Sequence, residues 1–171
     1  MYKKLLFFAV IMAIFYKLND YLSIFYCQII AIIIILALSN FLKLNLKKLY
    51  TDKYLKQNTI IFILLVIYIF VSQHVHVSTK CLAPVIGAPL FEELVFRGLL
   101  YKSLGKIKNK VLFFIVNSLI FMAAHISYYG DPSALLFVFC MGLVFCYLRN
   151  KYNNLIPGMY IHSITNLMTF I

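Results

Sequence analysis

Seven runs of mostly apolar residues alternate with short polar segments along the chain. The runs cover about residues 5–16, 21–42, 59–71, 82–101, 111–129, 134–148 and 155–171. Several are shorter than the roughly 20 residues that a helix needs to cross a membrane upright, and the first and third are the weakest as complete spans. We therefore predict an all-α fold, a polytopic membrane helical bundle of about seven transmembrane helices, in a single integral membrane domain over residues 1–171.

The composition agrees with a membrane protein and argues against a nucleic-acid partner. Hydrophobic residues make up 64% of the chain and charged residues 12%, whereas a soluble domain has roughly 25% charged residues. The formal net charge of +11 could suggest nucleic-acid binding. However, the lysines fall in the short segments between apolar runs, where they set the orientation of membrane spans. The expected partner is therefore the lipid bilayer.

The distribution of lysine predicts the topology. Basic segments precede the first run and follow the second, fourth and sixth, whereas the other connections carry at most one lysine. With seven spans, all these basic segments lie on one side, which the positive-inside rule makes cytoplasmic. The first run resembles a signal peptide, but no small-residue cleavage site follows it, so we interpret it as an uncleaved span. The Lys-, Ile- and Asn-rich composition suggests a multi-pass protein of a bacterial cell membrane.

The only two glutamates of the chain, Glu92 and Glu93, stand side by side within the fourth run. An ionisable residue at the centre of a membrane helix costs about 2.5–3.5 kcal/mol on insertion scales, so both are candidates for function. Arg97 lies four residues after Glu93 on the same helix face, and a guanidinium can bind a carboxylate through two parallel hydrogen bonds. We expect Glu93 and Arg97 to form a buried ion pair. Pro84, Gly87 and Pro89 could break this run, in which case its helix begins near Pro89.

Three further polar side chains stand out in the late runs: His125 in the fifth, and His162 and Asn166 in the seventh. His162 and Asn166 are four residues apart and therefore share a helix face. Counted along the helices at about 1.5 Å per residue, Glu92 and His162 lie at a similar depth in the membrane. His125 lies nearer the outer end of its run, so it reaches that depth only through tilt or a cavity. A single membrane histidine is often an interhelical hydrogen bond, but this many polar groups in three spans indicate a functional site.

These residues form three motifs, in this order on three late helices: Glu92-Glu93-x-x-x-Arg97, Phe121-x-x-x-His125 and His162-x-x-x-Asn166. The set resembles the CPBP intramembrane proteases, the family that includes the CAAX prenyl endopeptidases and the bacterial Abi proteins. The resemblance covers residues 84–171, and no motif position departs from the family pattern. Each motif alone has limited specificity, but all three in order make a strong signal.

The resemblance implies an intramembrane endopeptidase that hydrolyses a peptide bond within or near the membrane, in a membrane-embedded or membrane-associated peptide or protein. Peptide hydrolysis requires an activated water and a group that stabilises the tetrahedral oxyanion. We assign the general base to Glu92, with His125 sharing or orienting the water. His162 and Asn166 would stabilise the oxyanion, as their counterparts in the family are thought to.

The sequence leaves a metal cofactor open. Glutamate and histidine are legitimate zinc ligands, and a catalytic zinc has about three protein ligands and a water. Glu92, His125 and His162 could supply these ligands, although the chain contains no HExxH motif. The family that the chain resembles is variously described as metal-dependent or glutamate-dependent.

Two functions from other classes fit the same residues. The Glu–His set could form a relay in a proton-coupled or ion-handling membrane protein, which would tolerate Asn166→Ala better than an oxyanion site would. The chain is also similar to small family members that act as bacteriocin-type self-immunity proteins, which suggests a non-catalytic membrane protein that binds a peptide. That function would tolerate Glu92→Gln, whereas a hydrolase would not.

The predicted topology can be tested by cysteine labelling. A cysteine introduced at Lys47 or Lys108, in a background without the four native cysteines, should resist an impermeant thiol reagent in intact cells, because both positions are predicted to be cytoplasmic. Permeabilised cells provide the control in which both positions should react. Labelling of either position in intact cells would contradict the topology, and six spans with the first run in the interface would be the next arrangement to test.

Overall fold

The computed structural model of the protein describes residues 2–18, 22, 24–38 and 83–170, and this part of the chain contains helices and no strands. Its elements are, in order, α1 (Tyr2–Leu18), α2 (Ile24–Ala37), η1 (Ala83–Gly87), α6 (Ala88–Glu92), η2 (Glu93–Leu100), α7 (Tyr101–Ser103), α8 (Lys110–Ala123), η3 (Ile126–Tyr128), α9 (Pro132–Tyr152), α10 (Ile156–Leu167) and η4 (Met168–Phe170). The predicted all-α membrane bundle is confirmed. The run 59–71 and the lysine-rich segment before it lie outside the described residues, so the number of spans stays a prediction.

Among the described residues, the 21-residue helix α9 is the one helix whose length and composition would allow it to cross a membrane. Three shorter apolar helices cover Leu5–Leu18, Tyr26–Ala37 and Lys110–Ala123. Large apolar side chains on α8 and α9 are exposed, including Leu112, Leu119, Leu136 and Phe137. A lipid environment would cover such a surface without a free-energy cost.

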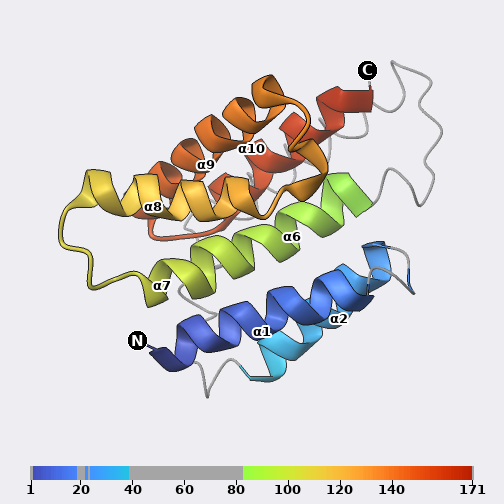
Figure 1. Ribbon diagram of the computed structural model, residues 1–171, viewed down its shortest axis with the longest axis horizontal. Coiled ribbons are helices and arrows are strands. Elements are labelled where there is room, and N and C mark those ends of the chain that lie inside the picture. The colour runs from blue at the N-terminus through green and yellow to red at the C-terminus, as the bar shows by residue number, and fades with distance from the viewer. Residues whose placement is uncertain (1, 19–21, 23, 39–82, 171) are drawn as a thin grey trace.

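One continuous helical rod runs from Ala83 to Ser103 through the middle of the bundle and consists of η1, α6, η2 and α7 (Figure 1). Within the described residues the rod is helical from Ala83 onward, so the prolines of this run do not delay the helix to Pro89. Both η1 and η2 are π-helices, whose wide turns are rare in proteins and frequent at functional sites. Glu92 and Glu93 stand at the point where α6 passes into η2.

The other helices cover this rod from two sides (Figure 1). On one side α1 packs along η2, and α2 packs against α6 and η1. On the other side α8 and α9 form a closely packed pair, and α10 lies against η1 and α6. Aromatic rings join these layers. Phe15 of α1 stacks on Phe91 of the rod at 4.6 Å between ring centroids, and Phe96 of the rod meets Phe121 of α8 edge to face at 5.0 Å.

Asparagine and aspartate side chains fix the ends of the helices around the rod. Asn109 accepts a backbone hydrogen bond at the start of α8, and Asp131 accepts the N–H groups of Ser133 and Ala134 at the start of α9. The Ser133 hydroxyl also donates to Asp131 and, with the Ala134 N–H, lowers the pKa of that carboxyl below its usual range. Asn153 caps the C-terminal end of α9, and its φ of 52° is left-handed. Asparagine tolerates this conformation better than most residues do.

The α8–α9 pair is closely apposed at Gly142. A Cβ atom added to Gly142 would lie 3.0 Å from the Cβ atom of Ser118 on α8. Ser118 is fully buried, so its side chain has little room to move away. Small residues at such crossings allow the backbones of membrane helices to approach each other.

Replacing Gly142 by leucine should therefore push α8 and α9 apart. Overpacking of a close-packed interior costs about 1–3 kcal/mol, so we expect Gly142→Leu to lower the melting temperature of the purified protein in detergent. Gly130→Leu is the matched control, because a Cβ atom at Gly130 would meet no atom within 4 Å. Equal melting temperatures for the two variants would contradict the proposed constraint on the α8–α9 pair.

Candidate active site

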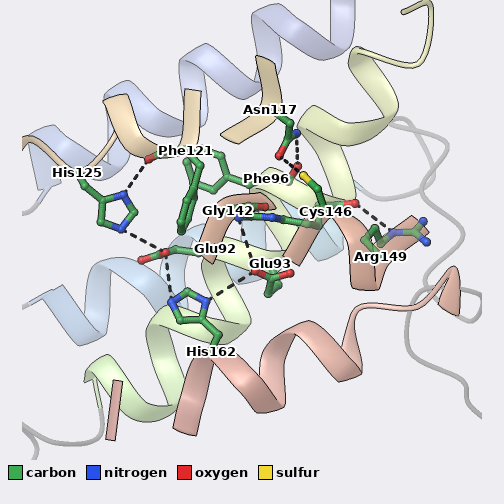
Figure 2. A network of polar contacts seen from close by, with 11 residues as sticks. Glu92, Glu93, Phe96, Asn117, Phe121, His125, Gly142, Cys146, Arg149 and His162 are labelled. Carbon is green, nitrogen blue, oxygen red and sulfur yellow. Dashed lines mark hydrogen bonds and ion pairs between the residues drawn. The ribbon is translucent and has the colours of Figure 1, made fainter. Parts of the chain in front are cut away.

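Glu92 and Glu93 occupy different environments although they are neighbours in the chain (Figure 2). Glu92 lines a cavity of about 810 Å³, and its side chain is 18% exposed. The Glu93 side chain is 1% exposed. The two carboxylates are therefore suited to separate tasks, because Glu92 can meet a molecule in the cavity and Glu93 is enclosed by protein.

His125 reaches Glu92 from the end of α8. The helix stops at Ala123, and the following turn places Nε2 of His125 3.7 Å from Oε2 of Glu92. The other ring nitrogen, Nδ1, lies 2.8 Å from the carbonyl oxygen of Phe121. Because a carbonyl can only accept, this contact assigns the proton to Nδ1 and leaves Nε2 of the neutral ring as an acceptor directed at Glu92. Tilt or a cavity were the two ways predicted for His125 to reach this depth, and His125 lines the same cavity as Glu92.

Two tyrosine hydroxyls bind the last carbonyls of α8, directly before His125. Tyr16 of α1 donates to the Ala124 carbonyl, and Tyr129 donates to the Ala123 carbonyl at 2.6 Å. A helix end leaves its last carbonyls without intrahelical partners, so these bonds fix the place where the chain turns towards His125. The sequence analysis missed both residues, because Tyr16 is distant in the sequence and tyrosine is common at membrane interfaces.

His162 connects the two glutamates. Its Nε2 lies 3.7 Å from Oε2 of Glu92, and its Nδ1 lies 3.7 Å from Oε1 of Glu93. The ring stacks on Phe145 of α9 with 4.8 Å between centroids and 22° between planes. One oxygen of Glu92 therefore lies at the same distance from a nitrogen of His125 and a nitrogen of His162, which brings three of the predicted site residues together (Figure 2).

Arg97 and Glu93 lie together in the interior, as their spacing predicted. Arg97 Nη1 is 3.6 Å from Glu93 Oε1, and Arg97 Nη2 donates to the Gly142 carbonyl at 3.2 Å. The guanidinium also lies over the ring of Phe121, at 4.1 Å from its centroid. On the far side, α10 approaches Glu93 closely, because a Cβ atom added to Gly158 would lie 2.7 Å from Glu93 Oε2. A larger residue at position 158 would force this carboxylate to shift from its place beside Arg97 and His162.

Asn166 lines the same cavity but makes a different contact. Its Nδ2 donates to the carbonyl oxygen of Pro84 at 2.7 Å, which ties α10 to the first turn of the rod. Within the part of the chain that the structure describes, it does not join the contacts between Glu92 and the two histidines. The oxyanion role of Asn166 therefore stays a prediction.

Two buried side chains outside the motifs bind the backbone of η2. Asn117 of α8 donates to the Phe96 carbonyl at 3.1 Å, and Arg149 of α9 donates to the Arg97 carbonyl at 3.2 Å. Both hold the π-helical rod that carries the glutamates. Arg149 could have been found from the sequence, because it and Arg97 are the only arginines among sixteen Lys and Arg residues.

The metal ligands predicted from the sequence are Glu92, His125 and His162. A zinc ion requires about three donor atoms at roughly 2 Å. Among residues 2–18, 22, 24–38 and 83–170, no group of three His, Cys, Asp or Glu side chains could hold a metal ion. Glutamate and histidine remain suitable donor types for zinc, so a zinc ion at these residues stays a prediction.

Comparison with known proteins gives one match. A family model described as "Rce1-like: Type II CAAX prenyl endopeptidase Rce1-like" matches residues 74–168, which is more than half of the chain. The matched segment includes every residue of the three motifs. No curated protein and no solved structure matches the chain.

Glu93 and Arg97 should be coupled in their effect on stability. Removing one partner of a buried charge pair costs roughly 3–5 kcal/mol, because the other charge stays buried without compensation. We expect Glu93→Ala and Arg97→Ala each to lower the melting temperature strongly, and the double variant to lose less than the sum of the single losses. A double-mutant cycle in detergent measures this coupling.

The exposed cation Lys108 provides the control for this cycle. Lys108→Ala should leave the melting temperature almost unchanged and should combine additively with Glu93→Ala. If the losses of Glu93→Ala and Arg97→Ala are also additive, the two charges do not stabilise each other and the ion pair is refuted.

Proposed function

The chain belongs to the Rce1-like family of type II CAAX prenyl endopeptidases, which are membrane-embedded proteases, and on this premise we propose that it hydrolyses peptide bonds at a site made of Glu92, His125, His162 and Asn166. The substrate is a membrane-embedded or membrane-associated peptide or protein, cut within or near the membrane. One observation carries the proposal: Glu92 Oε2 lies 3.7 Å from Nε2 of both histidines, at the wall of a cavity. The cavity volume of about 810 Å³ falls within the range of ligand sites, roughly 300–1,000 Å³.

Glu92 acts as the general base in this proposal. When the His125 ring is neutral, its Nε2 is an acceptor, and the Glu92 carboxylate is an acceptor as well, so a water between them can donate one hydrogen bond to each. As the water oxygen attacks the carbonyl carbon of the peptide, Glu92 takes its proton. The same proton then passes to the departing amine when the C–N bond breaks. Proton transfer of this kind contributes typically 10²–10⁴-fold to a rate.

His162 and Asn166 stabilise the oxyanion that forms on the peptide carbonyl. The Nδ1 side of the His162 ring faces the buried Glu93, and in the protonated ring the N–H at Nε2 lies beside Glu92, where it can donate to the oxyanion. The Asn166 amide carries two N–H donors. One donates to the Pro84 carbonyl, and the second can serve the oxyanion from the cavity wall.

Glu93 does not react in this scheme. Its burial separates it from the cavity, and its contacts with His162 and Arg97 give it a positioning task.

The protein acts as a multi-pass component of a bacterial cell membrane. The asymmetric distribution of lysine over the connecting segments supports the multi-pass topology, and the Lys-, Ile- and Asn-rich composition supports a bacterial source.

Glu92→Gln tests the hydrolytic function directly, because glutamine preserves the shape of the side chain and removes the base. The assay uses purified protein in nanodiscs with two fluorogenic peptides ending in Cys-aliphatic-aliphatic-X, one farnesylated and one not, and an unbiased peptide library. We expect Glu92→Gln to lower turnover of every cleaved peptide by at least about 10²-fold. Its melting temperature should match that of the wild-type protein.

Asp131→Asn is the matched control, since it removes an exposed carboxylate at the start of α9. This variant should cleave as the wild type does. Full cleavage by a well-folded Glu92→Gln protein would refute catalysis by Glu92. Peptide binding without cleavage by the wild-type protein would instead identify a non-catalytic peptide-binding protein, such as an immunity protein.

A further inference from the structure

We propose that Gln28 of α2 is a substrate-binding residue of the cavity, where its side-chain amide pairs with a peptide group of the substrate backbone. This inference rests on the proposed protease function and specifies how the cavity recognises its substrate. It assigns a role to a helix that lies outside the matched residues 74–168.

Gln28 is a buried polar residue whose side-chain oxygen lacks a hydrogen-bond partner among the described residues. Its side chain is 2% exposed, and Oε1 has no hydrogen-bond partner among the described residues. Buried amide oxygens in folded proteins are almost always hydrogen-bonded, so an unpaired one calls for an explanation. A ligand that donates a hydrogen bond to Oε1 provides one.

The side chain lies at the wall of the same cavity as Glu92. Ile24, one helical turn earlier, also lines the cavity. Tyr26, between these two residues, lines it as well, so the first turns of α2 form this wall. α2 packs against α6 and η1, the part of the rod that ends at Glu92. A peptide bound along this wall would therefore extend from Gln28 towards the reacting carboxylate.

The chemistry of the cavity explains why an amide is useful there. Most of the cavity wall is apolar, and it includes Ala83, Ala88, Phe137, Val138 and Met141. A substrate that enters it loses water from the N–H and C=O groups of its backbone, which is unfavourable unless they are paired again. A glutamine amide can accept from an N–H and donate to a C=O. It thus suits an extended peptide backbone of any sequence.

Binding to the Gln28→Met variant tests this role. Methionine has a similar length and volume but no amide. The probe is a fluorescently labelled Cys-aliphatic-aliphatic-X peptide, farnesylated or not, added to the full chain in nanodiscs in the Glu92→Gln background, so that binding is measured without turnover. We expect Gln28→Met to weaken the Kd roughly tenfold, the scale of one lost hydrogen bond. The melting temperature should be equal or higher, because an unpaired buried amide oxygen is removed.

A series of probes with one N-methyl group at successive positions locates the contact. At one position, N-methylation should weaken binding, and Gln28→Met should then cost less than it does with the unmethylated probe. Ile33→Met is the control on the same helix, since Ile33 is 58% exposed and does not line the cavity. It should change neither the Kd nor the melting temperature.

The possible failures are distinguishable. An unchanged Kd with Gln28→Met overturns the role of Gln28 while leaving the proposed function intact, and so does a fall in melting temperature that accompanies the loss of binding. If N-methylation at every position leaves the effect of Gln28→Met unaltered, the amide does not contact the backbone. If neither probe binds the Glu92→Gln protein at all, the proposed substrate class fails, and the role of Gln28 fails with it.

Discussion

The arrangement of the site depends on the burial of Arg97 in an apolar bundle. Its guanidinium is enclosed by the ring of Phe121 and the carbonyl of Gly142, and Glu93 supplies the opposite charge. Each of these charges would be expensive to bury alone, so each requires the other. Glu93 in turn contacts Nδ1 of His162, whose opposite nitrogen faces Glu92. The ion pair in the core thus determines the geometry at the wall of the cavity.

Local spacing explains what could be predicted from the sequence. The helical character of the runs, the contact between Glu93 and Arg97, and the common depth of Glu92 and His162 all follow from the periodicity of single helices, which sequence reports directly. The position of His125 does not follow in this way. It stands beyond the end of α8 and reaches Glu92 through a turn that tertiary contacts fix. Periodicity carries no information about such a turn.

The N-terminal helices illustrate the same limit. No motif lies before residue 84, and the family match begins at residue 74. Nevertheless α1 contributes Tyr16, which binds the carbonyl preceding His125, and α2 contributes Gln28 to the cavity wall. Nothing in the sequence around these two residues sets them apart from other polar residues of apolar helices. Their relevance arises only when the bundle brings α1 and α2 against the rod. The π-helical turns of that rod were likewise not predicted, because no local signal for them was identified.

The central claim is that Glu92 and its two histidines act as one hydrolytic unit. The most direct test compares kcat/KM of Glu92→Gln, His125→Ala and the double variant for one cleaved peptide. Residues that act as a unit show strongly non-additive losses. The account predicts that the double variant is about as slow as Glu92→Gln alone. If the two losses multiply, the residues contribute independently, and the single water between Glu92 and His125 is contradicted.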